Sequence, residues 1–184
     1  MSVTVIAIPG ASNANSYQTV AEIDAYFEIK VPVSASALWL DADDDPKAGA
    51  AVYATQWMDA LISLTGYPTT STQSLLWPRN SMLDKTGLEF VDSTIIPQEW
   101  KNAHAELARE LLVSDRTAEL SQLAQGLASI RTGPIKLEFK NPSGKGNDPQ
   151  QPPVIPPYVI SLLVPSWIDD INGGKPTSYE LVRW

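Results

Sequence analysis

The sequence predicts a mainly α-helical protein: a small helical bundle with short β elements and extended N- and C-terminal arms. Three stretches place apolar residues at helical spacing, and each has a start or stop signal. One further stretch alternates apolar and charged residues as a strand does. A chain of 184 residues is long enough for one domain with a core of its own. Helices therefore dominate the expected fold, and the strands are too few for a large sheet.

The first helix is expected to start after Thr19. Thr19 and Glu22 have the spacing of a capping box, in which each side chain bonds to the backbone amide of the other residue. The apolar stripe that follows lies at Val20, Ile23 and Phe27. Pro32 is expected to end this helix. Before it, residues 3–8 read as a short strand or an arm, and the asparagines at 13 and 15 suit a turn.

The second helix is expected to start at the acidic triplet 43–45, just before Pro46. Acidic side chains favour the positive end of the helix dipole, and proline fits the first turn. A calcium site is the alternative for this triplet, but the loop pattern with its closing glutamate is missing. The apolar stripe lies at Ala54, Trp57, Met58, Leu61 and Leu64, with Gly66 as the expected stop.

The third helix is expected to open at Pro97. Its apolar stripe lies at Trp100, Ala103, His104, Leu107, Ala108, Leu111 and Leu112. The only histidine of the chain, His104, is thus expected to be a packing residue and not a general base. Residues 67–95 between the two helices are polar and irregular, with a turn at 84–87, and residues 118–130 suit a short amphipathic helix or an ordered loop.

The C-terminal part begins with the clearest strand signal of the chain. Ile135, Leu137 and Phe139 alternate with charged residues, and six prolines between 141 and 157 then predict a stiff connector. Residues 158–167 have a helical pattern, and 178–184 read as an extended tail. Three regions follow: residues 1–140 as the core with its arm and strand, 141–157 as the connector, and 158–184 as a C-terminal helix and docking tail. The alternative is that 158–184 folds back onto its own helices.

Charge argues against a protein whose main task is to grip nucleic acid. The formal net charge is −8, and residues 1–45 carry seven acidic residues against one basic residue. No three basic residues are consecutive. Because DNA affinity comes largely from clustered Lys and Arg, tight binding of single-stranded DNA at physiological salt is not expected.

Composition argues against several other classes. There is no cysteine and a single histidine, which excludes disulfides, thiol chemistry and a multi-histidine metal site. No catalytic or cofactor-binding motif is present, so we expect no enzymatic activity, no metal and no cofactor. Neither a membrane span nor a signal peptide is expected. Of the six tryptophans, Trp57, Trp100 and Trp167 lie on apolar stripes and are expected in the core, with Trp77 and Trp184 outside it.

Four segments in order resemble one known family. They are NANSYQTVAEIDAYF at 13–27, Leu-Leu-Trp-Pro-Arg at 75–79, Ile-Pro-Gln-Glu-Trp at 96–100 and the tail 154–184. This succession resembles the head–tail adaptor, or head-completion, proteins of tailed bacteriophages. Members of that family often carry the label of DnaT-like single-stranded-DNA-binding protein. The label and the resemblance imply different functions.

The resemblance implies a structural virion protein. It would form a ring of about a dozen copies at the virion neck, assembled in the host cytoplasm, and would join the portal protein to a tail or head-closure protein. Genome DNA would pass through the ring without sequence-specific binding, and no membrane would be involved. The residues expected to contact partners are Trp77, Arg79, Tyr179, Leu181, Arg183 and Trp184. The alternative function is a single-stranded-DNA-binding replication accessory protein.

Overall fold

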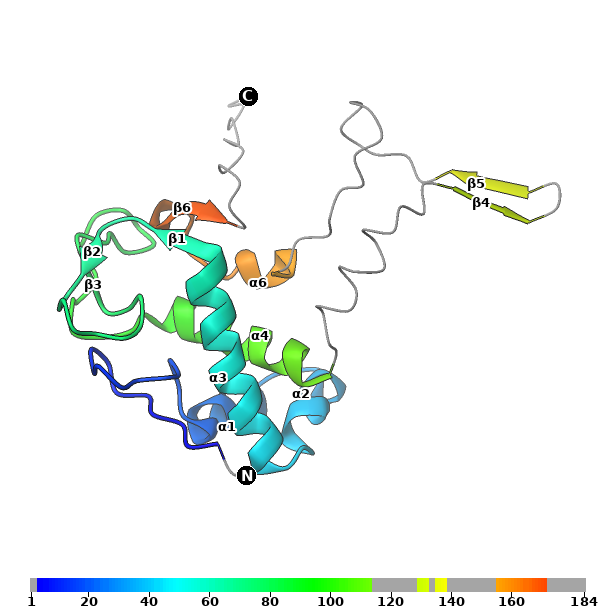
Figure 1. Ribbon diagram of the computed structural model, residues 1–184, viewed down its shortest axis with the longest axis horizontal. Helices are drawn as coiled ribbons and strands as arrows, with labels where there is room; N and C mark the ends of the chain where they lie inside the picture. Colours follow the sequence, from blue (N-terminus) through cyan, green and yellow to red (C-terminus); the bar gives the residue numbers. More distant parts are fainter. Residues whose placement is uncertain (1–2, 114–128, 133–134, 139–154, 172–184) are drawn as a thin grey trace. The chain divides into compact units, whose positions relative to one another are not determined.

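The computed structural model describes residues 3–113, 129–132, 135–138 and 155–171. The chain divides into two units, one that joins 3–113 to 155–171 and one within 114–154. The first unit contains the helices and two short sheets, and the second contains a β hairpin (Figure 1). The expected fold class, mainly α with short β elements, is confirmed.

Helix α1 (Val20–Glu28) starts as the sequence predicts. The amide of Glu22 donates to the Thr19 hydroxyl at 3.2 Å, and the Thr19 amide donates to the Glu22 carboxylate at 2.8 Å. Both members of the capping box therefore satisfy an amide that the helix itself leaves unpaired. Ile23 and Phe27 are buried on the inner face of α1.

Helix α2 (Val33–Leu40) was not expected from the sequence. Pro32 was expected to end the preceding helix, but α1 already ends at Glu28, and Pro32 is the N-cap residue of α2. Proline is tolerated at a helix start because the first amides have no partner within the helix. The helix is held in place by Trp39, which is fully buried and donates from Nε1 to Asp24 at 2.8 Å.

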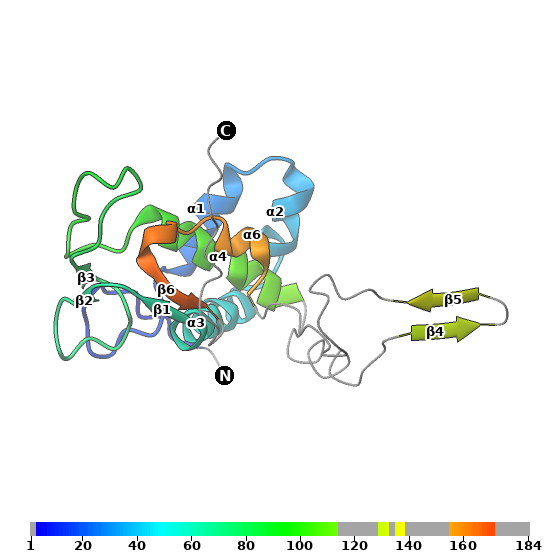
Figure 2. The same cartoon turned by 90° about the horizontal axis from the view of Figure 1, so that it is seen from above.

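Two long helices, α3 (Asp44–Leu61) and α4 (Gln98–Val113), cross at the centre of the first unit (Figures 1 and 2). Both begin where the sequence predicts, with the acidic pair Asp44 and Asp45 in the first turn of α3. Helix α3 ends at Leu61, five residues before Gly66. The chain continues there as strand β1 (Ile62–Leu64), because β1 pairs with a distant strand near the C-terminus.

The segment 155–171 folds back onto the helices, which was the alternative reading of this region. It contains the short helix α6 (Pro157–Ile160), the 3-10 turn η1 (Pro165–Trp167) and strand β6 (Ile168–Ile171). Strand β6 pairs antiparallel with β1. The expected helix over 158–167 is thus only one turn long, and Pro165 begins a separate 3-10 turn. The tail beyond 171 lies outside the described residues.

The core of the first unit is built around tryptophans. Trp57, Trp100 and Trp167 are buried, as predicted. Trp77 is fully buried as well, which corrects the expectation that it lies outside the core. Its ring lies 5.2 Å from that of Trp167 and 6.0 Å from that of Trp100, centroid to centroid. A loop residue enters the core here because two other segments, those of Trp100 and Trp167, pack against it.

Three two-stranded antiparallel sheets complete the described structure. Besides β1–β6, strand β2 (Tyr67–Pro68) pairs with β3 (Arg79–Asn80), and β4 (Ser129–Thr132) pairs with β5 (Ile135–Glu138). Strand β5 lies where the alternating pattern predicts. It pairs with β4 of its own chain.

Candidate nucleic-acid interface

The basic residues of the first unit are already engaged. Its described residues carry sixteen acidic and six basic residues, a net charge of −10. Four of the basic residues are lysines, and each forms an ion pair, with these partners: Lys30 with Glu106, Lys47 with Asp24, Lys85 with Glu99, and Lys101 with Glu22. The other two are Arg79 and Arg109, whose contacts are internal too. In this part of the chain every described basic side chain has a partner within the protein, and Lys85 is the most exposed of the four lysines in these ion pairs.

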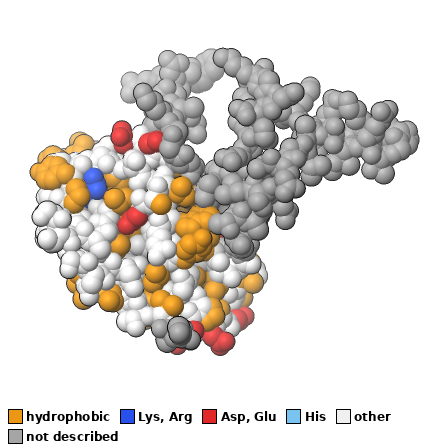
Figure 3. Space-filling model, in the orientation of Figure 1, with side chains coloured by type: hydrophobic (Ala, Val, Ile, Leu, Met, Phe, Trp, Pro, Cys, Tyr) orange, Lys and Arg blue, Asp and Glu red, His pale blue; other side chains and the backbone are white. Residues whose placement is uncertain are grey.

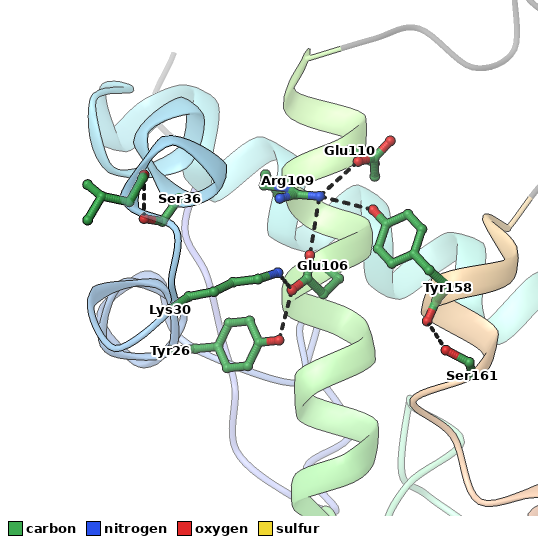
Figure 4. Close-up of polar contacts among 9 residues, drawn as sticks. Tyr26, Lys30, Ser36, Glu106, Arg109, Glu110, Tyr158 and Ser161 are labelled. Carbon is green, nitrogen blue, oxygen red and sulfur yellow. Dashed lines mark hydrogen bonds and ion pairs between the residues drawn. The ribbon is translucent and has the colours of Figure 1, made fainter.

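Glu106 is the centre of a polar cluster that includes two basic side chains and two tyrosine hydroxyls (Figure 4). It is 2% exposed on α4, accepts a hydrogen bond from the Tyr26 hydroxyl at 2.8 Å and pairs with Lys30. Arg109 lies 3.3 Å from Glu106 and also donates to the Tyr158 hydroxyl at 3.2 Å. The cluster therefore joins α1, α4 and α6. Its cations neutralise a buried carboxylate, which makes them poor candidates for binding an external anion.

Arg79, one of the expected partner contacts, serves the backbone. Its guanidinium donates to the carbonyl oxygens of Thr65 and Gly66, both at 2.9 Å, and of Leu64 and Leu76 at 3.3 and 3.2 Å. The residue is 6% exposed. The fork of donors on an arginine suits such carbonyl clusters. Arg79 and the buried Trp77 thus hold the loops around β2 and β3 together.

The remaining expected contacts, Tyr179, Leu181, Arg183 and Trp184, lie outside the described residues. Their role in binding a partner stays a prediction.

The surface of the first unit offers no basic groove among its described residues. Lys and Arg side chains are sparse on the face in Figure 3, where acidic and hydrophobic side chains are spread over the surface. Two open hollows of about 420 and 440 Å³ are lined by apolar, hydroxyl, amide and acidic side chains, without a lysine or arginine. The described residues also contain no group of three metal-ligating side chains and no helix long and apolar enough to cross a membrane.

The second unit, 114–154, carries five basic and four acidic residues, a net charge of +1, and most of its basic residues lie in one stretch. Residues 129–145 carry four basic residues and one acidic residue, a net charge of +3. The basic residues are Arg131, Lys136, Lys140 and Lys145, and the acidic residue is Glu138. Arg131 on β4 is the register partner of Lys136 on β5 (yellow in Figure 1). In general, like charges directly opposite one another on neighbouring strands weaken the pairing of the strands.

This pair was missed in the sequence analysis. The expectation of weak DNA binding rested on the charge of the whole chain and on runs of consecutive basic residues. Strand pairing brings together residues that are five positions apart, which no such run reveals. The signal that could have found them is the local charge of 129–145, together with the Gly133–Pro134 turn signal between two strand-like stretches.

Fold and charge together define a small acidic α-helical protein with a separate basic β hairpin. A family model described as "Putative DnaT-like ssDNA binding protein" matches residues 1–183, and the chain belongs to this family. Neither the curated proteins nor the solved structures include a match to this chain.

The family match corrects the recognition made from the sequence. The chain matches the DnaT-like family and not a head–tail adaptor, so the ring, the portal and tail partners, and the virion neck are not supported. The alternative function fits the match better. The physical reason lies in the residues that carried the resemblance: the capping box, the buried Trp77 and Trp100, and the carbonyl-bound Arg79 hold the fold together. These residues stabilise the fold, so their presence does not identify a binding partner.

Proposed function

We propose that this protein binds single-stranded DNA and that the β4–β5 hairpin supplies the contacts to phosphate. The observation that carries the proposal is the Arg131–Lys136 register pair within the stretch of net charge +3. A phosphate between these two residues would remove their mutual repulsion, and its release of counterions would favour binding. The description of the family supports the same function.

The acidic first unit is not expected to contact the DNA. With a net charge of −10 on its described residues and its cations internally paired, it repels phosphate. The single-stranded DNA would therefore contact the hairpin region and not the helices. Binding of this kind is salt-sensitive and independent of base sequence, because phosphate contacts carry no direct sequence information. The function is one of binding and not of catalysis.

The test is a titration of fluorescent oligothymidylate followed by anisotropy at several salt concentrations. Four cations at about −0.7 each give a slope of log K against log salt no steeper than about −3. Replacing two of them, in the double variant Arg131→Ala with Lys136→Ala, should reduce the slope by about 1.4 and weaken binding about tenfold or more at low salt. The matched control is Lys85→Ala, which removes one exposed cation from the acidic unit and should leave binding unchanged.

Two results would overturn the proposal. One is wild-type binding that the hairpin variant retains in full, which would place the contacts elsewhere. The other is the absence of any salt-dependent binding at low salt. Circular dichroism of each variant serves to show that the helical unit is intact.

A further inference from the structure

The loop from Met82 to Asp92 presents two large apolar side chains to solvent. Leu88 is 84% exposed and Phe90 is 73% exposed. Hydrophobic side chains gather at the upper left of Figure 3, over β2 and the loops beside it. Neighbouring apolar groups with this exposure are typical of a surface that contacts another molecule. We call residues 82–92 the apolar loop.

The apolar loop is held in one conformation by its own hydrogen bonds. The Asp84 carboxylate accepts from the amide of Thr86 at 3.1 Å and from the amide of Leu88 at 3.3 Å. Two backbone hydrogen bonds join the two sides of the loop. The Asp84 amide donates to the Glu89 carbonyl at 2.7 Å, and the Val91 amide donates to the Met82 carbonyl at 2.8 Å. A loop that is already ordered loses little entropy on binding, so its exposed side chains can act as anchors.

The base of the loop is tied to the core. Met82 is 1% exposed, and the indole Nε1 of Trp167 donates to the carbonyl of Leu83. Gly87 turns the chain with φ +73°, a conformation that other residues rarely adopt. The anchors Leu88 and Phe90 therefore project from a support that the helical unit keeps in place.

The charge around the anchors is mainly negative. Asp84, Glu89 and Asp92 lie on the loop with a single basic residue, Lys85, which pairs with Glu99 of α4 at 3.4 Å. Hydrogen bonds from Thr86 and Thr94 lower the pKa values of Asp84 and Asp92, so both are ionised at neutral pH. Acidic groups beside apolar anchors disfavour nucleic acid and complement a basic partner.

We propose that the apolar loop is a docking site for a second protein, which offers an apolar pocket for Leu88 and Phe90 flanked by lysine or arginine. The pocket would bury the two anchors, and the basic flanks would pair with the acidic rim and speed association. This inference does not depend on DNA binding, because the acidic loop and the basic hairpin belong to different units.

The test is a selection of short random peptides displayed on yeast against the purified full-length protein. Enriched peptides should combine aromatic or aliphatic residues with Lys or Arg. Their affinity should fall about 30-fold for the variant Leu88→Ser with Phe90→Ser, the loss expected for a hot spot. Glu89→Lys should weaken binding mainly by slowing association, and Thr86→Ala should weaken it by loosening the loop while both anchors remain.

The matched control is Ile29→Ser, which removes an apolar side chain of equal exposure at the end of α1. It should leave the affinity unchanged. The proposal fails if no peptide is enriched, if the enriched peptides are acidic, or if they bind the double serine variant as tightly as the wild type. It also fails if sedimentation shows the protein associating with itself through Leu88 and Phe90, since a second copy would then occupy the site.

Discussion

The hydroxyl of Tyr17 donates a hydrogen bond to the carboxylate of Asp59, which joins the N-terminal arm to α3. Tyr17 is 1% exposed, and its ring meets Trp100 edge-on at 5.5 Å between centroids. Burial is the main reason that the pKa of Asp59 rises to about 6 from its ordinary 3.8, against the opposing effects of Tyr17 and Arg79. The link between arm and helix is therefore sensitive to pH.

Asp59 is expected to contribute more to the free energy of unfolding at acidic pH than at neutral pH. Because its pKa is higher in the folded state, its contribution is fully present below about pH 4 and is lost as pH rises through about 6. The loss amounts to about 3 kcal/mol. Asp59→Asn has no carboxyl group to titrate at this position, so it does not undergo this loss. The difference in the free energy of unfolding, variant minus wild type, should therefore rise by up to about 3 kcal/mol as the pH rises from about 4 to above 6. Urea denaturation at a series of pH values measures it, and a constant difference between the two proteins would contradict the assignment.

His104 is expected to act in the opposite direction. It is fully buried between Gln18, Thr55 and the carbonyl of Ala51, and burial lowers its pKa to about 4 from 6.5. Its stabilising contribution is therefore present above about pH 6.5 and is lost as pH falls through 4. Wild type alone would show the sum of the two effects. The comparison with Asp59→Asn isolates the aspartate, because His104 is present in both proteins.

Replacing Trp77 tests whether this loop residue belongs to the core. Trp77→Ala should lower the free energy of unfolding by about 3–5 kcal/mol, the range for loss of a large buried side chain. The same cost is expected for Trp100→Ala. Thermal melts followed by circular dichroism measure both, with Tyr67→Ala as the control because that side chain is 58% exposed. A Trp77→Ala variant that melts like wild type would remove Trp77 from the core.

The Glu106 cluster is expected to contribute more than a surface ion pair. Glu106→Gln leaves Lys30 and Arg109 without their shared carboxylate and should cost about 2–3 kcal/mol. Lys85→Ala, which removes an exposed pair with Glu99, should cost less than about 1 kcal/mol. Denaturant titrations of both variants make the comparison, and equal costs would contradict a structural role for the cluster.

Arg79 offers a test that separates structure from binding. Arg79→Lys keeps the charge but loses the fork that reaches the carbonyl oxygens of Leu64, Thr65, Gly66 and Leu76, and should cost about 2 kcal/mol. Binding of single-stranded DNA should not change, because the guanidinium does not contact the strand in the proposed mode. A variant of normal stability and weakened DNA binding would reverse this assignment.

Local features of the sequence determined much of the helical unit. The capping box at Thr19 and Glu22, the acidic start of α3 and the apolar stripe of α4 act within one or two turns of chain, so they could be read without knowing what packs against them. The alternation at 135–138 predicted β5 for the same reason. Each of these signals depends on neighbours a few residues away.

Only the tertiary structure decided the rest, because the decisive contacts join distant residues. The early end of α3 follows from the pairing of β1 with β6, more than a hundred residues later. The burial of Trp77 follows from Trp100 and Trp167, which belong to other segments. The same holds for the candidate interface. The six described basic residues of the helical unit have partners that the fold brings to them, and Arg131 is the register partner of Lys136 only because two strands pair. Net charge and motif order do not record such contacts. They therefore describe the composition of the chain and not which charged residues the fold brings together.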